Sequence, residues 1–343
     1  MNEHQKTPRI QDVAKRAGVS TATVSRVLSN PSIVSERTRK AVEQAVAETG
    51  YTVNLTARNL RQQQVGAVLA LVPKLANPFF SEILSGISSA LRQEGINLLV
   101  LDTQAGDGPP DLSAIAPYLT RSHADGVIVL DGSLDAGLFK HHGCPPVVQA
   151  CEWVEGLDAP RVLADNEGGA ALAISHLIEL GHRKIAHLSG PSANTLTKSR
   201  SKGVEAAMRA EGVDLVARFE GDFKLKSGHD AGVSLLALSD RPTAVFCDND
   251  EMALGLLQAL VRGGLRVPQD ISIVGFDNIE IAAYALPPLT TIRQKRASIG
   301  SRAAEILVGL MKASKFDVQT EIMPTELIER ESCAPPPGLE HQD

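Results

Sequence analysis

Polar and aromatic side chains follow a series of short apolar runs along most of the sequence, and these side chains are the residues best suited to bind a ligand. In open α/β sheets, ligands bind beyond the carboxyl ends of the strands, where the loops gather. Carboxylates and amides hydrogen-bond vicinal hydroxyls, and an aromatic face stacks on a ring. The pattern therefore predicts a site for a small polyhydroxylated molecule. The residues just past the runs are Phe79, Phe80, Asp131, Asp165, Asn166, Ser192–Asn194, Asp222, Phe223, Asp248–Asp250, Asp277 and Asn278.

The runs themselves predict the strands that would position this site. They occupy residues 66–73, 96–103, 125–132, 145–151, 184–190, 243–249 and 272–278, with a further strand near Phe219. Continuous apolar runs are typical of parallel strands buried on both faces, and the amphipathic segments between them predict crossover helices. One series ends before Asp165 and another begins after it. We therefore expect two doubly wound, parallel-sheet α/β lobes with the ligand between them.

A second group of candidate residues lies near the N-terminus, on a short helix predicted at Thr21–Leu28. Apolar spacing predicts a helix over residues 10–17 before it, Gly18 permits a tight turn, and Ser20 is suited to cap the second helix. Two short helices separated by about three residues form a helix-turn-helix unit. A third helix is expected from Ser35 to Glu48, ended by Gly50. The outward residues of the second helix have short side chains and one guanidinium, which suit the edges of DNA bases; they are Thr21, Ala22, Thr23, Ser25 and Arg26.

Charge is distributed unevenly along the chain. Residues 1–64 contain ten Lys and Arg against five Asp and Glu, a net charge of +5, so the remaining residues carry −11 of the total of −6. A basic front end on an acidic body favours polyanion binding at the N-terminal end. On charge alone, a chance asymmetry is the alternative.

Length and composition limit the class of protein. The chain has 343 residues, of which 43% are hydrophobic and 22% charged, enough for two or three globular domains. Its four cysteines form no CxxC pair, as expected in a reducing cytoplasm. No stretch approaches the ~20 apolar residues that cross a bilayer, and the first ten residues lack a secretory core. We expect a cytoplasmic protein with no membrane partner.

The motifs of several enzyme classes are missing. The sequence has no phosphate-binding Gly-x-x-x-x-Gly-Lys-Ser/Thr loop and no Gly-x-Gly-x-x-Gly after the first run. Ser189 lies outside a nucleophile elbow. His141, His142 and Cys144 have metal-ligand chemistry but stand isolated beside two prolines, which argues against a metal site. We expect no enzyme activity, no metal and no cofactor.

The N-terminal string DVAKRAGVSTATVSRVL, followed by VSERTR and GY, resembles the DNA-binding headpiece of the lactose-repressor/galactose-repressor (LacI/GalR) family. The resemblance extends over about residues 8–332 through NPFFSEI, DGVIVL, GHRKIAHLSGP, RPTAVFCDND, RVPQDISIVGFDN and PPLTTI. The resemblance implies a periplasmic-binding-protein-like core. Within the family, the sequence looks most similar to the nucleoside-responsive and purine repressors.

The resemblance implies roles for residues on the DNA side. Family members carry a hinge that wedges a leucine into the minor groove, which places the wedge on Leu60 with Arg58 beside it. Many relatives have proline before the hinge asparagine, but this chain has Val53, which lacks the fixed φ of proline. The predicted DNA-binding residues are Thr21, Ala22, Thr23, Ser25, Arg26, Ser29, Arg58 and Leu60.

On the ligand side, the resemblance implies that Phe80 stacks on the ligand and that Arg200 and Asp277 hydrogen-bond it. Phe223, Asp250 and Asn194 would complete the walls. Purine repressors have arginine and threonine where this chain has Asn194 and Leu196, which argues against a purine base and leaves a sugar, a nucleoside or a related metabolite.

These features predict a homodimeric transcription repressor whose affinity for double-stranded operator DNA is controlled by a small-molecule effector. The expected divisions are a headpiece at 8–52, a hinge at 53–64, a two-lobed core at 65–332 and a tail at 333–343. The sequence leaves open whether the effector is an inducer or a corepressor. The alternatives are a ligand-binding receptor without a DNA function and, less favoured, an enzyme of sugar metabolism.

Overall fold

The computed structural model describes residues 8–29, 31–51, 64–104, 110–312 and 320–338. The chain forms two compact units, residues 1–64 and 65–343, and each is described by itself. No helix in the described part of the chain is both long enough and apolar enough to span a membrane.

The first unit is a small bundle of helices. It contains α1 (Ile10–Ala17), α2 (Thr21–Ser29), the short 3₁₀ helix η1 (Pro31–Ile33) and α3 (Glu36–Thr49). Gly18 ends α1 at a φ of +66°, a conformation that glycine adopts without a steric penalty, and the Ser20 hydroxyl accepts a hydrogen bond from the Thr23 amide at 3.1 Å. The predicted helix-turn-helix is therefore confirmed. Its core is made by Val13, Ala14, Val24, Val27, Val42 and Ala45.

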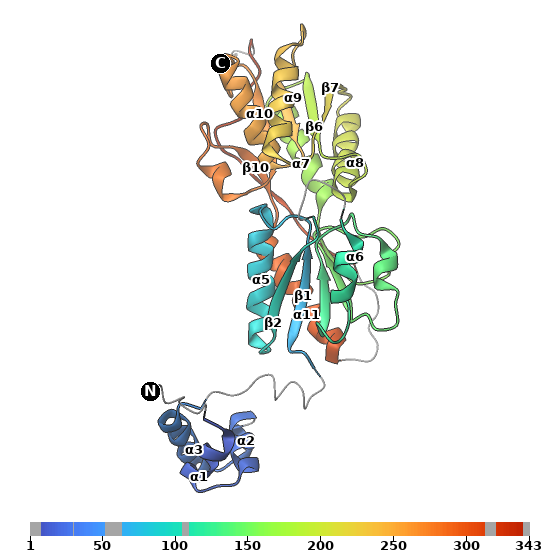
Figure 1. Ribbon diagram of the computed structural model, residues 1–343. Coiled ribbons are helices and arrows are strands. Elements are labelled where there is room, and N and C mark those ends of the chain that lie inside the picture. Colours follow the sequence, from blue (N-terminus) through green and yellow to red (C-terminus); the bar gives the residue numbers. More distant parts are fainter. Residues whose placement is uncertain (1–7, 30, 52–63, 105–109, 313–319, 339–343) are drawn as a thin grey trace, which may run out of the picture. The chain divides into compact units, whose positions relative to one another are not determined.

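The second unit contains two six-stranded sheets, one in each of two lobes (Figure 1). The sheet of the first lobe is parallel throughout, in the order β11-β5-β4-β3-β1-β2. Helices α5 (Phe79–Gln93) and α11 (Arg296–Lys312) cover one face, and the short helices α6 (Leu112–Ile115), η2 (Ala116–Tyr118) and η3 (Ala136–Phe139) accompany the core on the other. The strands are β1 (Ala67–Val72), β2 (Asn97–Asp102), β3 (Gly126–Val129), β4 (Val147–Ala150), β5 (Arg161–Ala164) and β11 (Thr320–Met323).

The sheet of the second lobe has the order β12-β10-β9-β8-β6-β7, and only β12 runs antiparallel to its neighbour. Helices α7 (Asn166–Glu179) and α8 (Thr195–Ala210) pack on one face, and α9 (Leu225–Leu236) and α10 (Asp250–Arg262) pack on the other. The short helix η4 (Glu280–Ala283) follows β9. The strands are β6 (Ile185–Ser189), β7 (Leu215–Glu220), β8 (Ala244–Cys247), β9 (Ser272–Asp277), β10 (Thr290–Arg293) and β12 (Glu326–Ile328). The two predicted doubly wound lobes are confirmed.

The chain passes between the lobes three times. It crosses from β5 to α7, returns from β10 to α11, and crosses again from β11 to β12. The first and third crossings lie side by side, because the Asp165 amide donates to the Met323 carbonyl at 2.8 Å and the Thr325 hydroxyl donates to the Asp165 carbonyl at 3.3 Å. The sequence patterns did not predict β10, α11, β11 or β12. The second and third crossings, which these elements form, were therefore not expected from the sequence.

Helices α5 and α11 of the first lobe touch through glycines. A Cβ on Gly86 would lie 2.0 Å from the Ala297 carbonyl oxygen, and one on Gly300 would lie 2.1 Å from the carbonyl oxygen of Ile83. Only glycine permits this approach. The contact fixes α11 to the first lobe directly after the chain has left the second.

The C-terminal end of the core extends past residue 332. The carbonyl of Ala334 accepts hydrogen bonds from the Ser272 hydroxyl at 3.0 Å and from the ring of His182 at 2.9 Å. The chain is thus still bonded to the second lobe two residues beyond the expected end of the core.

Candidate ligand cleft and DNA-binding helix

In the first unit, α2 presents an outer face of small polar side chains. Thr21, Ala22 and Arg26 are exposed, and Thr23 and Ser25 are half-buried beside them. Val24 and Val27 face the opposite way, into the core. The Thr23 hydroxyl lies 2.9 Å from the Ser20 hydroxyl at the start of the helix. Helix α2 therefore offers one face on which a guanidinium is surrounded by side chains short enough to approach a base edge.

The structure does not describe the side chains of three predicted DNA contacts. Arg58 and Leu60 lie outside the described residues, as does the side chain of Ser29. Behind α2, Arg16 of α1 and Glu48 of α3 form an ion pair that links these two helices.

In the second unit, the loops beyond the carboxyl ends of the strands of both lobes enclose a cleft of about 620 Å³. This is the edge at which ligands bind in open α/β sheets, and its volume suits a small molecule. Five of the six predicted ligand residues line it. They are Phe80, Asn194, Arg200, Phe223 and Asp277.

The aromatic wall of the cleft comes mainly from the start of α5. The rings of Phe79 and Phe80 are 5.1 Å apart in an edge-to-face arrangement, and both side chains line the cleft. Phe223 contributes from the second lobe and adopts a φ of +62°, which is unusual for a residue with a side chain. Its carbonyl accepts a hydrogen bond from Asn249 at 2.9 Å. These rings can stack on a planar or puckered ring.

Arg200 lies at the centre of the polar wall and is almost completely buried. Its Nε donates to the Asn166 side chain at 3.0 Å, its Nη1 donates to the Asp248 carbonyl, and its guanidinium lies 3.9 Å from the centre of the Phe276 ring. Nη2 is 3.9 Å from the Asp277 carboxylate. A guanidinium held on so many sides is fixed in direction, so it can orient a ligand oxygen.

Asp277 is the carboxylate partner in this wall. It occupies the last position of β9 with a φ of +120°, and its Oδ1 accepts a hydrogen bond from Gln294 at 2.6 Å. Burial raises the pKa of Asp277 to about 6, although the charges of Arg200 and Arg296 oppose the rise. The charges of Arg200 and Arg296 favour the ionised carboxylate, which can accept hydrogen bonds from ligand hydroxyls.

Glu152 is a cleft residue that the sequence analysis missed. It follows β4 after one intervening residue, which is the same strand-end position that identified the others. Its Oε2 accepts hydrogen bonds from the Gly132 amide at 3.0 Å and from the Asn194 side chain at 3.4 Å. Burial raises the pKa of Glu152 from 4.5 to about 7. Asn194 also caps α8, since its Oδ1 accepts from the Leu196 amide at 2.7 Å.

Asp250 does not line the cleft, which corrects the prediction that it forms a wall. The side chain is fully buried behind the lining, where its carboxyl oxygens accept hydrogen bonds from the Thr291 hydroxyl at 2.6 Å and the Ile279 amide at 2.9 Å. Burial, together with the charge of Asp277, raises the pKa of Asp250 to about 8. A strand-end carboxylate can point either into the loops or back into the sheet, and this one ties α10 to β10.

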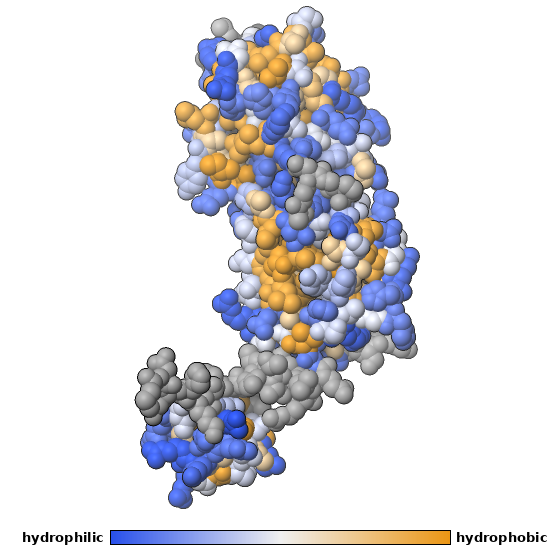
Figure 2. All heavy atoms as spheres, viewed as in Figure 1, coloured by the Kyte–Doolittle hydropathy of each residue, from blue (hydrophilic) through white to orange (hydrophobic). Residues whose placement is uncertain are grey.

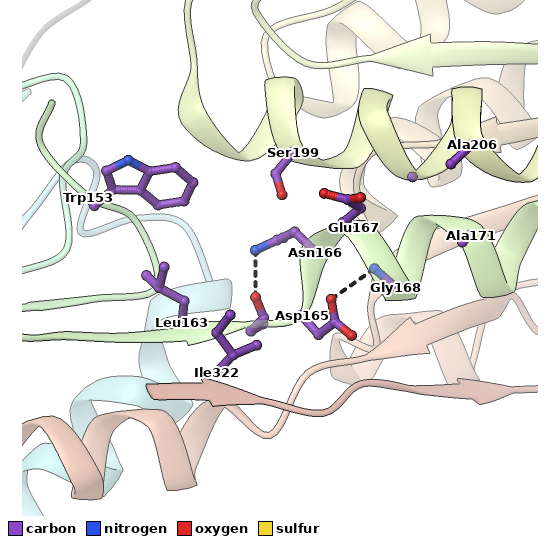
Figure 3. Close-up of a pocket in the computed structure, with 12 residues that line it drawn as sticks. Trp153, Leu163, Asp165, Asn166, Glu167, Gly168, Ala171, Ser199, Ala206 and Ile322 are labelled. Atoms are coloured by element: carbon purple, nitrogen blue, oxygen red, sulfur yellow. Dashed lines mark hydrogen bonds between the residues drawn. The ribbon is translucent and has the colours of Figure 1, made fainter. Parts of the chain in front are cut away.

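A second pocket of about 460 Å³ lies where β5 crosses into α7 (Figure 3). Figure 3 shows Trp153 on one side of it, Ser199 of α8 above, and Leu163 and Ile322 below. Sequence neighbours line the two pockets: Glu152 and Arg200 line the cleft, and Trp153 and Ser199 line the second pocket. Trp153, the single tryptophan of the chain, thus lies between the lobes.

Within the described ranges, no three or more His, Cys, Asp and Glu side chains are grouped in a way that could hold a metal ion. The lining of the cleft combines hydrogen-bonding side chains with the rings of Phe79, Phe80 and Phe223. This chemistry suits the binding of an organic ligand.

Comparisons with known proteins agree with this division of the chain. Residues 9–54 match the family described as "Bacterial regulatory proteins, lacI family", and residues 174–333 match the "Periplasmic binding protein-like domain". The repressor CytR of Escherichia coli K12 is 39% identical over 327 residues, which cover 94% of this chain and 95% of CytR.

Two solved structures are also similar over nearly the whole chain. The Lac repressor dimer bound to operator and the anti-inducer ONPF has a TM-score of 0.81 at 30% identity, covering 96% of this chain and all of that one. The complex of the transcriptional regulator CelR with cellobiose has a TM-score of 0.72 at 31% identity, covering 95% of this chain and 99% of that one.

Proposed function

Because the chain belongs to the lacI family of bacterial regulatory proteins, we propose that it is a transcription repressor whose affinity for operator DNA is set by a sugar or a nucleoside bound in the cleft. The observation that carries the proposal is the convergence of Phe80, Arg200 and Asp277 in one cleft of a chain that also presents α2. An effector controls DNA binding only if it binds two arrangements of the protein with different affinity. A cleft walled by both lobes meets that requirement, since any change in lobe angle changes the cleft.

The charges of the cleft favour an effector without a phosphate. Its lining contains three basic side chains, Lys74, Arg200 and Lys224, and six acidic ones. The acidic residues are Asp131, Asp135, Glu152, Glu155, Asp222 and Asp277. An excess of acidic groups in a partly buried site disfavours an anionic ligand. We therefore expect a neutral, polyhydroxylated effector, and we expect nucleotides and sugar acids to bind weakly.

The exposed face of α2 supports the DNA-binding half of the proposal. We assign DNA contacts to Thr21, Ala22, Thr23, Ser25 and Arg26, and to Ser29, Arg58 and Leu60, whose side chains lie outside the described part of the molecule. The relative solved with operator supports the same role for this unit.

We propose that the functional form is a homodimer, because one protein must present two helices to two half-sites. Strand β2 is the edge of its sheet and exposes Leu99 and Val100, which are 46% and 39% exposed. Figure 2 shows apolar atoms gathered on the face that carries α5 and β2. An exposed apolar sheet edge usually pairs with another surface, and the Lac repressor dimer supports a second copy of the chain.

A thermal-shift screen of nucleosides, pentoses, hexoses and sugar acids tests the effector half. A ligand at 100 times its dissociation constant adds roughly 2.7 kcal/mol of apparent stability. The hit should then change the affinity for a DNA duplex that the protein has selected from a random pool. The proposal fails if a stabilising ligand leaves that affinity unchanged.

A ligand-binding receptor without a DNA function is the alternative, and a truncation distinguishes the two. A chain that starts at Val65 keeps the complete second unit and lacks α2. This truncated chain should bind the effector as tightly as the full chain does, but it should no longer bind the selected duplex. Equal DNA binding by both chains would overturn the assignment of α2.

A further inference from the structure

Arg296 contacts both lobes at once. It is the first residue of α11, directly after the second crossing, and its side chain is only 3% exposed. In the first lobe, Nη1 donates to the Phe79 carbonyl at 3.2 Å and Nη2 donates to the Glu82 carboxylate at 2.9 Å. In the second lobe, Nη2 donates to the Asn278 carbonyl at 3.1 Å. One guanidinium therefore joins the start of α5 to the end of β9.

The partners of Arg296 are attached to the two walls of the cleft. Phe79 is itself a lining residue, and Asn278 follows the ligand carboxylate Asp277 in the chain. Asn278 is held in place from its own lobe, because its side-chain oxygen accepts a hydrogen bond from Arg330 at 2.6 Å. A movement of either wall is thus transmitted to the Arg296 contacts.

Local packing alone does not account for this arrangement. Gly86 and Gly300 already fix α11 against α5 without any help from Arg296. Among the residues that the structure describes, the Nε of Arg296 has no hydrogen-bond partner although it is buried, which is rare for a polar atom in a folded protein. The side chain is therefore placed to reach Asn278 rather than to satisfy all its own donors within the first lobe.

We propose that Arg296 is a positioning residue that sets the resting orientation of the two lobes, and through it the operator affinity of the ligand-free protein. The last step rests on the proposed function. The bond to Asn278 must lengthen or change partner when the lobes rotate, whereas the bonds to Phe79 and Glu82 stay within one lobe. The bridge therefore stabilises one lobe angle over others.

Two variants test the bridge, and a third serves as the matched control. Arg296→Met removes the guanidinium, and Glu82→Gln weakens its hold on α5 at a side chain that is 54% exposed and tolerant of change. The control, Glu94→Gln, removes an exposed ion pair in which the Glu94 carboxylate lies 2.7 Å from the Lys312 ammonium group. This pair joins α5 and α11 at the ends opposite to Arg296.

The first measurement is acrylamide quenching of Trp153 fluorescence in the ligand-free full-length protein. Trp153 belongs to the first lobe, and its pocket is closed from the second lobe by Ser199, Gly203 and Ala206 of α8. The second measurement is the affinity for the duplex that the wild-type protein selects from a random pool. Both bridge variants should change the quenching constant in the same direction and the affinity by roughly fivefold or more, a typical allosteric coupling. Glu94→Gln should leave both as in the wild type.

The proposal is overturned if Glu82→Gln and Arg296→Met have the same quenching constant and the same affinity for the selected duplex as the wild type and Glu94→Gln. If Arg296→Met fails to fold, Glu82→Gln alone decides. If the wild type selects no duplex above background, the proposed function fails, and the quenching experiment still decides whether the bridge sets the lobe orientation.

Discussion

Replacing Glu152 by glutamine should make the stability of the protein less sensitive to pH. Glu152 as a whole residue is 9% exposed, and its side chain lines the cleft and accepts a hydrogen bond from the Gly132 amide. Glutamine has nearly the same shape, can accept the same hydrogen bond, and carries no charge at any pH. The substitution therefore isolates the effect of a buried ionisable group.

The size of the effect follows from the pKa of Glu152. Burial raises that pKa from 4.5 to about 7, so the folded protein binds this proton more tightly than the unfolded chain does. Stability from this group is fully present below pH 4.5 and is lost as the pH rises through 7, because the folded state must then bury a charge. Between pH 5 and pH 8 the expected loss is on the order of 2–3 kcal/mol, using 1.36 kcal/mol per pKa unit.

Urea unfolding of both proteins at pH 5 and pH 8 measures this loss. Other groups titrate over the same range, but their contributions cancel in the difference between variant and wild type. On going from pH 5 to pH 8, we expect Glu152→Gln to gain about 1–3 kcal/mol in stability relative to the wild type. The lower end allows for an imperfect contact of the new amide with the Asn194 side chain.

Glu155→Gln is the control for this experiment. Glu155 lines the same cleft, but its side chain is 70% exposed and pairs with Lys198 at the surface. Its replacement should give the same difference from the wild type at both pH values. A Glu152→Gln difference that is equally independent of pH would refute the argument that burial raises the pKa of this carboxyl.

Three further predictions concern the other parts of the molecule. Arg26→Ala should weaken binding to the selected duplex by roughly 1–3 kcal/mol in a fluorescence anisotropy titration; an equal loss on random DNA would make Arg26 a phosphate contact instead. Asp277→Ala should abolish binding of the effector found by thermal shift, measured by calorimetry, and leave ligand-free DNA affinity near the wild-type value; unchanged effector affinity would remove Asp277 from the site. Gly86→Ala should destabilise the second unit by about 3 kcal/mol or more in urea unfolding, because the new methyl group would lie 2.0 Å from the Ala297 carbonyl oxygen and α5 would have to move; a loss below about 1 kcal/mol would show that the helices separate easily.

Most of the fold could be predicted because its signals are local. Apolar runs identified the buried strands β1, β3, β4, β6, β8 and β9 but not β5 or β10. Gly18 and Ser20 marked the turn and cap of the helix-turn-helix. The start of α8 at Thr195 also follows from a local signal, because the Asn194 side chain caps the helix. Strand-end position brought five of six ligand residues to the cleft.

What the sequence did not reveal depends on contacts between distant segments. Strand β11 pairs with β5 across more than 150 positions, and nothing in its own residues signals that pairing. Asp250 was wrongly predicted to line the cleft, because the direction of a strand-end carboxylate depends on its hydrogen-bond partners. Here the partner is Thr291, which is distant in the sequence. Arg296 was overlooked for the same reason, since its partners Phe79 and Asn278 lie far from it or in the other lobe.

The three passages of the chain between the lobes restrict how proteins of this architecture can diverge. Neither lobe is one continuous stretch of sequence, so a single genetic exchange cannot replace one lobe and keep the other intact. A recombinant joined between β6 and β10 would combine strands from two parents in both sheets at once. New effector specificities should therefore arise by point substitutions at the cleft or by exchange of the whole second unit. The helix-turn-helix unit is continuous in sequence and can be exchanged in one step.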